Sequence, residues 1–191
     1  MQKEQPWAAT IVKKMSHFLS ARDENLGVFV EQNLIYLNEI YEYENESPKR
    51  KETMRYKTDI LVYEWTSTDT WKPRVVIELK LSSVSTHDVI TYSQKSLDHK
   101  TVHPCLRYGI LIGNFGDTGI PGRVIRHGEY FDFMITWKSL NSSKIEWDNF
   151  IGIIFSEIQA SRDLEKILSN TKSKFRQKIS ILHRKLITKF E

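Results

Sequence analysis

The chain has 191 residues, of which 40% are hydrophobic and 27% charged, with a formal net charge of +4. This length and composition predict one domain with a sizeable core, and no apolar run approaches the ~20 residues of a membrane-spanning helix. The N-terminus lacks the apolar core of a signal peptide, and the lone Cys105 excludes an intrachain disulfide and a multi-cysteine zinc site. We therefore expect a cytoplasmic protein with no membrane segment, whose mild positive charge permits an anionic partner without requiring one.

The first forty residues predict two amphipathic helices. Residues 6 to 20 place apolar side chains at helical spacing. Residues 25 to 38 repeat that pattern, and Glu31 borders the apolar stripe. The alternating segment from 40 to 44 is then expected to be a strand, followed by a basic turn that bends at Pro48.

The most informative stretch is a predicted β-hairpin over residues 55 to 80. Two runs rich in β-branched and aromatic residues flank a short segment of Thr, Ser and Asp. If the chain reverses in the middle of that segment, Asp59 lies opposite Glu78, and Lys80 points to the same side as Glu78. Directly opposed residues have Cβ atoms about 5 Å apart, so two carboxylates and an ammonium would converge.

These charges have two interpretations. They could mark the solvated face of an antiparallel sheet. That face, however, is apolar along most of its length and charged at one end only. Burying two carboxylates side by side would raise the pKa of one of them unless a cation neutralises the pair. A divalent metal with oxygen ligands would do this, and Mg²⁺ is typically held by one or two carboxylates together with phosphate oxygens.

The downstream half predicts a crossover unit. Ser85 and Asp88 resemble a capping box that opens a helix from about 86 to 99. The apolar run from 106 to 115 suits a buried strand, and a strand–helix–strand crossover should make it parallel to the strand that carries Glu78. The fold class is therefore α/β: a mixed β-sheet core flanked by helices, with a helical C-terminal extension.

Two histidines of this region have the spacing of metal ligands. His99 and His103 are four residues apart, but Pro104 should end the helix before His103. We expect both to be ordinary surface residues.

Basic segments occupy the last third of the chain. Residues 114 to 130 are glycine-rich and basic, which predicts an exposed loop that either lies on the surface or enters a DNA groove. A partly alternating strand is expected at 130 to 137, and a helical tail from 147. Residues 172 to 190 interleave Lys and Arg with apolar side chains and contain no acid. Such a helix can bind nucleic acid, lie on an anionic membrane, pack on the protein or pair with a second subunit.

We divide the chain, as a single domain overall, into a core of residues 1–145 and a basic helical extension of residues 146–191. That extension is expected to pack on the core or at a subunit interface.

Asp59, followed after eighteen residues by Glu78-Leu79-Lys80, resembles the motif of the PD-(D/E)XK nuclease superfamily, which includes most type II restriction endonucleases. The order of elements strengthens the resemblance: an acid at the head of a strand, a hairpin, the E-x-K triplet, a helix and a strand. The similarity covers roughly residues 25 to 115. Thr58 stands where the family often has proline.

The resemblance implies Mg²⁺-dependent hydrolysis of DNA phosphodiester bonds, with Mn²⁺ able to substitute. Asp59, Glu78 and the main-chain carbonyl of Leu79 would hold the metal, and Lys80 would position the attacking water or act as its base. A glutamate from an early helix often completes the acidic cluster, and Glu31 is the candidate. Further contacts to DNA are expected from basic side chains of the crossover helix and the glycine-rich loop: Lys95, Arg123 and Arg126.

The expected substrate is double-stranded DNA. A palindromic site needs two active sites, so a homodimer is expected. Two alternatives remain: a repair, recombination or phage-defence nuclease selective for DNA structure, and a non-catalytic DNA-binding module that keeps the nuclease fold.

Overall fold

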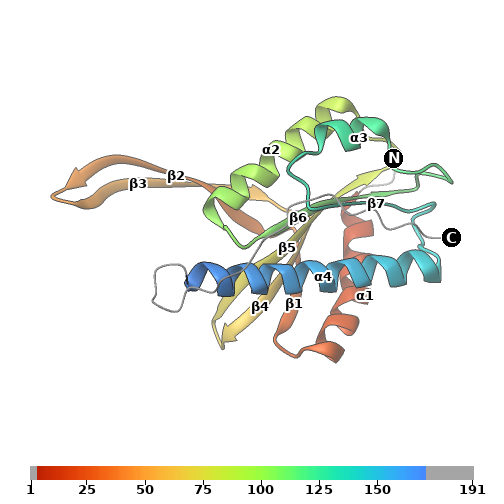
Figure 1. The fold of residues 1–191 in the computed structure, drawn as a ribbon, viewed down its shortest axis with the longest axis horizontal. Helices are drawn as coiled ribbons and strands as arrows, with labels where there is room; N and C mark the ends of the chain where they lie inside the picture. Colours follow the sequence, from red (N-terminus) through yellow and green to blue (C-terminus); the bar gives the residue numbers. More distant parts are fainter. Residues whose placement is uncertain (1–3, 171–191) are drawn as a thin grey trace.

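The computed structural model describes residues 4–170 as an α/β sandwich around a five-stranded mixed sheet (Figure 1). Along the sheet, each of the first three strands is antiparallel to its neighbour, and the last two strands are parallel to the third. The expected fold class and the parallel crossover are therefore confirmed. In sheet order the strands are β1 (Leu26–Val30), β4 (Ile60–Ser67), β5 (Thr70–Leu81), β6 (Arg107–Gly113) and β7 (Phe133–Thr136).

Helices cover both faces of this sheet (Figure 1). One face packs against α1 (Glu4–Arg22) and α4 (Lys144–Ser169). The other packs against α2 (Thr86–Val102) and α3 (Gly122–His127). Because side chains alternate along a strand, the residues of β5 divide between the two layers. The alternate set that contains Val75, Ile77 and Leu79 is buried towards α1 and α4, so Glu78 must point towards α2.

The central hairpin has the register that its sequence predicts. Ile60 pairs with Ile77, and the strands reverse after Ser67, which pairs with Thr70. Extending that register by one residue places Asp59 beside Glu78. A bulge after Val62 alters the pairing only farther from this end.

The predicted helix over residues 25 to 38 is wrong, because this segment forms β1 and the start of β2 (Asn33–Glu44). Its apolar residues are spaced as in a helix, but three of them, Leu26, Phe29 and Val30, lie in a short run that pairs with β4. Pairing with an existing strand outweighs so weak a helical preference.

A second hairpin, formed by β2 and β3 (Ser47–Lys57), extends away from the body of the molecule (Figure 1). The expected strand at 40 to 44 is thus confirmed, but the bend at Pro48 is wrong. The chain reverses before it, with Asn45 at φ 54°, a left-handed conformation that asparagine tolerates. Pro48 lies within β3.

The capping box of α2 is confirmed, because the Ser85 hydroxyl accepts the Asp88 N–H while the Asp88 carboxylate accepts the Ser85 N–H. The segment from 114 to 130 is not loop throughout, since it contains α3. The basic stretch from 172 to 190 lies outside the described residues. Within residues 4–170, no helix is long and apolar enough to cross a membrane.

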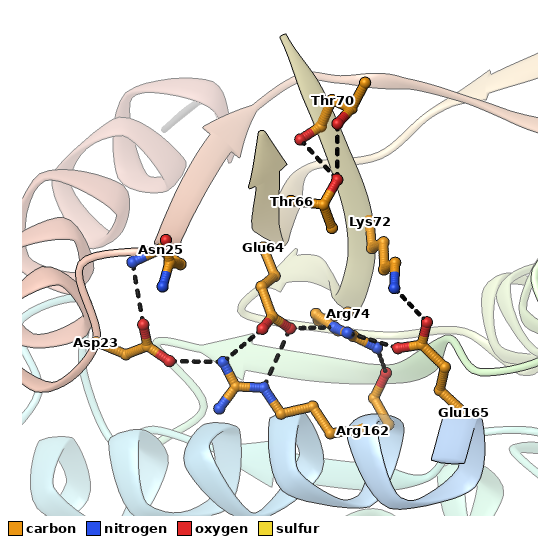
Figure 2. Close-up of polar contacts among 10 residues, drawn as sticks. Asp23, Asn25, Glu64, Thr66, Thr70, Lys72, Arg74, Arg162 and Glu165 are labelled. Atoms are coloured by element: carbon orange, nitrogen blue, oxygen red, sulfur yellow. Dashed lines mark hydrogen bonds and ion pairs between the residues drawn. The ribbon is translucent and has the colours of Figure 1, made fainter. Parts of the chain in front are cut away.

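The last helix is fastened to the sheet by apolar and ionic contacts. Its buried side chains include Trp147, Phe150 and Ile154. Figure 2 shows Arg162 of α4 reaching two carboxylates, Glu64 of β4 at 2.9 Å and Asp23 after α1 at 2.6 Å. Neighbouring Arg74 of β5 pairs with Glu64 at 2.6 Å and with Glu165 of α4 at 2.7 Å (Figure 2). This network lies among α1, α4 and one end of the hairpin.

Candidate active site

Asp59 and Glu78 meet where β4 begins. Asp59 is the residue before β4, and its Oδ2 accepts the main-chain N–H of Leu79 at 2.8 Å. The N–H and C=O of a strand residue point towards the same neighbouring strand, so the Leu79 carbonyl lies on the Asp59 side of β5. The three groups that the family resemblance assigns to the metal therefore come together.

Glu78 is held in an environment that opposes its charge. Its side chain is almost completely buried, and burial raises its pKa to about 8, with a further contribution from the neighbouring Asp59 carboxylate. The positive charge of Lys95 and the hydroxyl of Tyr108 act in the opposite direction. In the absence of a bound cation, Glu78 is thus a carboxyl group that lacks a sufficient counter-charge.

Tyr108 and Lys95 complete the surroundings of Glu78. Tyr108 lies on β6, and its hydroxyl donates a hydrogen bond to Glu78 Oε1. Lys95 comes from α2, and its Nζ lies about 5 Å from the ring centres of Tyr56 and Tyr92. Tyr108 was not foreseen. It could have been, because parallel pairing sets Ile110 beside Glu78, and Tyr108 shares the face of Ile110.

Lys80 lies at the end of β5 beside the first turn of α1. Its Nζ is 3.5 Å from Glu4 Oε1 and 4.8 Å from the ring centre of Tyr92. Burial alone would lower the pKa of Lys80, but the hydrogen bond to Tyr92 and the charge of Glu4 raise it overall. An early helix does bring a glutamate to the motif, but that residue is Glu4. The sequence places Glu4 at the start of the first predicted helix. It does not show that this end of the helix lies beside the motif.

Glu31 lies beside Asp59, although not on a helix. It follows β1 with φ 54°, and its N–H donates to the Asp59 carbonyl at 3.0 Å. Its side chain accepts a hydrogen bond from Gln5 at 2.5 Å and lies 3.8 Å from Lys57 Nζ. The main chain of Glu31 thus helps to place Asp59, while its carboxylate is bonded elsewhere.

Thr58, the departure from the family's proline, has a structural use. It is fully buried, and both its N–H and its hydroxyl donate to the Gln32 carbonyl at 2.9 Å. Proline could make neither bond, since it has no N–H and no hydroxyl. These bonds hold the two ends of the β2–β3 hairpin together, at the position immediately before Asp59.

Arg123 and Arg126 both lie on α3. Arg123 donates to the Val84 carbonyl at 3.4 Å, in the loop that follows β5. Neither arginine forms a hydrogen bond or ion pair with the motif residues Asp59, Glu78 and Lys80. A role for them in binding DNA stays a prediction.

His99 and His103 are not ordinary surface residues. His99 is completely buried and His103 partly so, with ring nitrogens 3.2 Å and 2.9 Å from the Ile35 carbonyl of β2. Burial lowers the pKa of His99 to about 4. The expectation failed because the base of the second hairpin covers α2, and the sequence did not reveal that hairpin. His99 also stacks on Tyr108, with ring centres 5.7 Å apart.

The donor set fits a hard divalent cation, although not by side chains alone. Within residues 4–170, no three His, Cys, Asp or Glu side chains are grouped so as to hold a metal ion. Asp59 and Glu78 supply two carboxylates, and the Leu79 carbonyl supplies a third oxygen. Mg²⁺ is commonly bound by this few protein oxygens, with water and substrate phosphate filling the other positions.

A scan against protein-family models found no match for this chain, and a search of curated proteins found none. The resemblance to the PD-(D/E)XK superfamily thus depends on the motif and on the arrangement of its residues.

Proposed function

We propose that this protein is a metal-dependent endonuclease that hydrolyses phosphodiester bonds of double-stranded DNA. The observation that best supports this function is the meeting of Asp59 and Glu78 at one end of a mixed sheet, with Lys80 two residues farther along the same strand. A purely structural site would not need a buried carboxyl group beside a second carboxylate. A cation bound between them would relieve that conflict and give the pair a chemical use.

Each residue would have one task. Bound Mg²⁺, or Mn²⁺ in its place, would neutralise charge on the scissile phosphate and lower the pKa of a bound water. Asp59, Glu78 and the Leu79 carbonyl would hold the ion, with Glu78 oriented by Tyr108. Lys80, whose raised pKa keeps it an ammonium ion, would hold the attacking water and offset charge on the pentavalent transition state.

A type II restriction endonuclease is the specific form that we favour. Two copies related by a two-fold axis would then cut the two strands of a palindromic site in cytoplasmic DNA. Phosphate contacts would position the duplex, and loops that reach base edges would read it. Glu31 as an auxiliary acid, and Lys95, Arg123 and Arg126 as phosphate-binding groups, belong to this proposal.

The decisive experiment incubates plasmid and phage DNA with the protein and Mg²⁺, and then sequences the ends. Asp59→Ala, Glu78→Ala and Lys80→Ala should each abolish cleavage while circular dichroism shows a folded protein. Glu24→Ala, which removes an exposed acid far from the motif, is the control and should cut normally. Full activity in Glu78→Ala would disprove the proposal.

The pattern of products separates the alternatives. Discrete bands would indicate a sequence-specific enzyme, and a smear would indicate a nuclease that selects DNA structure. Intact DNA with a gel shift would indicate a non-catalytic binding module. Chelation by EDTA should stop cleavage, and Ca²⁺ should support binding without turnover, because it tolerates longer, irregular coordination.

A further inference from the structure

Most of the β2–β3 hairpin, residues 33–57, does not pack on the rest of the protein. We call this hairpin the arm. Every residue from Ser47 to Arg55 is exposed, and only the base of the arm packs on α2. Figure 1 shows the remainder extending past the helix. A two-stranded hairpin without a third strand is marginally stable in water. Such an extension therefore calls for a binding partner.

The two faces of the arm carry different charges. Every residue from 50 to 57 of β3 has a partner on β2, so β3 has no bulge in this range. Its side chains therefore alternate between the two faces of the arm. One face presents three basic side chains of β3, and the β2 residues that pair with this face include no acid. We call it the basic face: Lys51, Thr53, Arg55 and Lys57, opposite Ile40, Asn38, Ile35 and Asn33.

The opposite face carries more acidic than basic side chains. It holds Arg50 with Glu52, whose side chains pair at 3.7 Å, and it also carries Glu39 and Glu42 from β2. On the basic face, by contrast, Lys51 and Arg55 form no ion pair with any of residues 4–170. Cations left unpaired on an exposed ribbon suit an anionic partner.

The basic face also starts at the candidate active site. Lys57 is two residues before Asp59, and Lys51 lies about 20 Å farther along the strand at ~3.3 Å per residue. A DNA duplex presents one negative charge per ~1.7 Å of its axis. A duplex that is bound at the site and runs along the arm would therefore place several phosphates within reach of these cations.

We propose that the basic face of the arm binds the phosphates of double-stranded DNA beside the bond that is cut. This inference depends on the proposed function, and it specifies the path that the duplex takes across the protein. A two-stranded ribbon also fits the major groove, but phosphate contacts alone are enough here. Because phosphates are the same at every step, the arm contributes affinity without sequence preference.

The test measures the salt dependence of binding to a 30-bp duplex, with Ca²⁺ replacing Mg²⁺ so that the DNA stays intact. Lys51→Gln/Arg55→Gln removes two contacts, so the slope of log affinity against log salt should become shallower by about 1.8. Between 50 and 200 mM salt, the parent should thus lose about twelve-fold more affinity than the variant. Cleavage at saturating DNA should keep the parent rate, because neither residue belongs to the candidate site.

Lys144→Gln/Lys166→Gln is the matched control, since it removes the same charge from exposed positions on α4. It should keep the parent slope. If the parent cleaves DNA but the arm variant also keeps the parent slope, the arm inference is wrong and the nuclease proposal stands. If light scattering gives the arm variant half the molar mass of the parent, the arm binds a second copy of the chain and the inference is wrong. A parent that neither binds nor cuts DNA would overturn both proposals.

Discussion

The buried carboxyl group of Glu78 should make the metal-free protein less stable than its Glu78→Gln variant at neutral pH. The carboxyl titrates at about 8 in the folded protein, against an ordinary value of 4.5. Between these values the folded state holds one more proton than the unfolded state, so the free energy of unfolding falls as pH rises. Glutamine resembles the protonated carboxyl, keeps an acceptor for Tyr108 and does not titrate.

The expected size follows from 1.36 kcal/mol per pKa unit. At pH 7, ionisation in the unfolded state alone destabilises the fold by about 3 kcal/mol, and above pH 8 by about 5 kcal/mol. At pH 4.5 and below the effect disappears. A typical domain has only 5–15 kcal/mol of stability, so a change of about 3 kcal/mol is readily measured.

Urea unfolding in EDTA from pH 5 to 8 provides the measurement. The parent should lose stability across this range relative to Glu78→Gln, and Glu24→Gln should follow the parent. Adding Mg²⁺ should flatten the parent's slope, since metal binding favours the ionised carboxylate and releases its proton. If the free energy of unfolding in EDTA changes equally with pH for the parent and for Glu78→Gln, the raised pKa of Glu78 and its destabilising effect are both refuted.

Three further predictions concern two residues near the site and one residue of the ionic network that fastens α4. Tyr108→Phe removes a hydrogen bond worth about 1.5 kcal/mol, so cleavage should need roughly ten-fold more Mg²⁺; an unchanged metal midpoint would contradict this. His99 has its pKa lowered to about 4, so its contribution to stability is complete above 6.5 and falls by about 3 kcal/mol as pH drops to 4. His99→Gln should flatten this acid limb in urea unfolding, and an unaltered limb would count against the prediction. Arg74→Met leaves Glu64 with one cation and should lower stability by about 2–3 kcal/mol without changing metal affinity; parent-like unfolding would show that the buried pair is dispensable.

The motif hairpin was predictable because its signals are local. Period-two alternation sets the face of Glu78 and Lys80, and the short turn sets the register that brings Asp59 opposite Glu78. The capping box of α2 and the apolar run of β6 are equally local. Together they specify the three central strands β4, β5 and β6 and the meeting of Asp59 with Glu78.

The remainder of the site depends on tertiary contacts. The segment from 25 to 38 has apolar residues at a spacing that suits a helix, and only pairing with β4 makes it a strand. His99 looks exposed until the base of the arm covers it. Glu4 reaches Lys80 because of how α1 crosses the sheet, and no spacing along the chain encodes this.

Strand β5 can hold a buried carboxyl group because its other face stabilises the fold. Val75, Ile77 and Leu79 are fully buried against α1 and α4, and each contributes roughly 1.5–3 kcal/mol. Their sum, about 4.5–9 kcal/mol, exceeds the cost of about 3 kcal/mol that Glu78 imposes at pH 7. The alternation that buries these three residues also fixes the direction of Glu78, so the strained carboxyl cannot turn to solvent without the strand leaving the sheet. The core thereby fixes Glu78 beside Asp59, so a destabilising change at Ile77 should impair the proposed metal binding although Ile77 lies on the other face of β5.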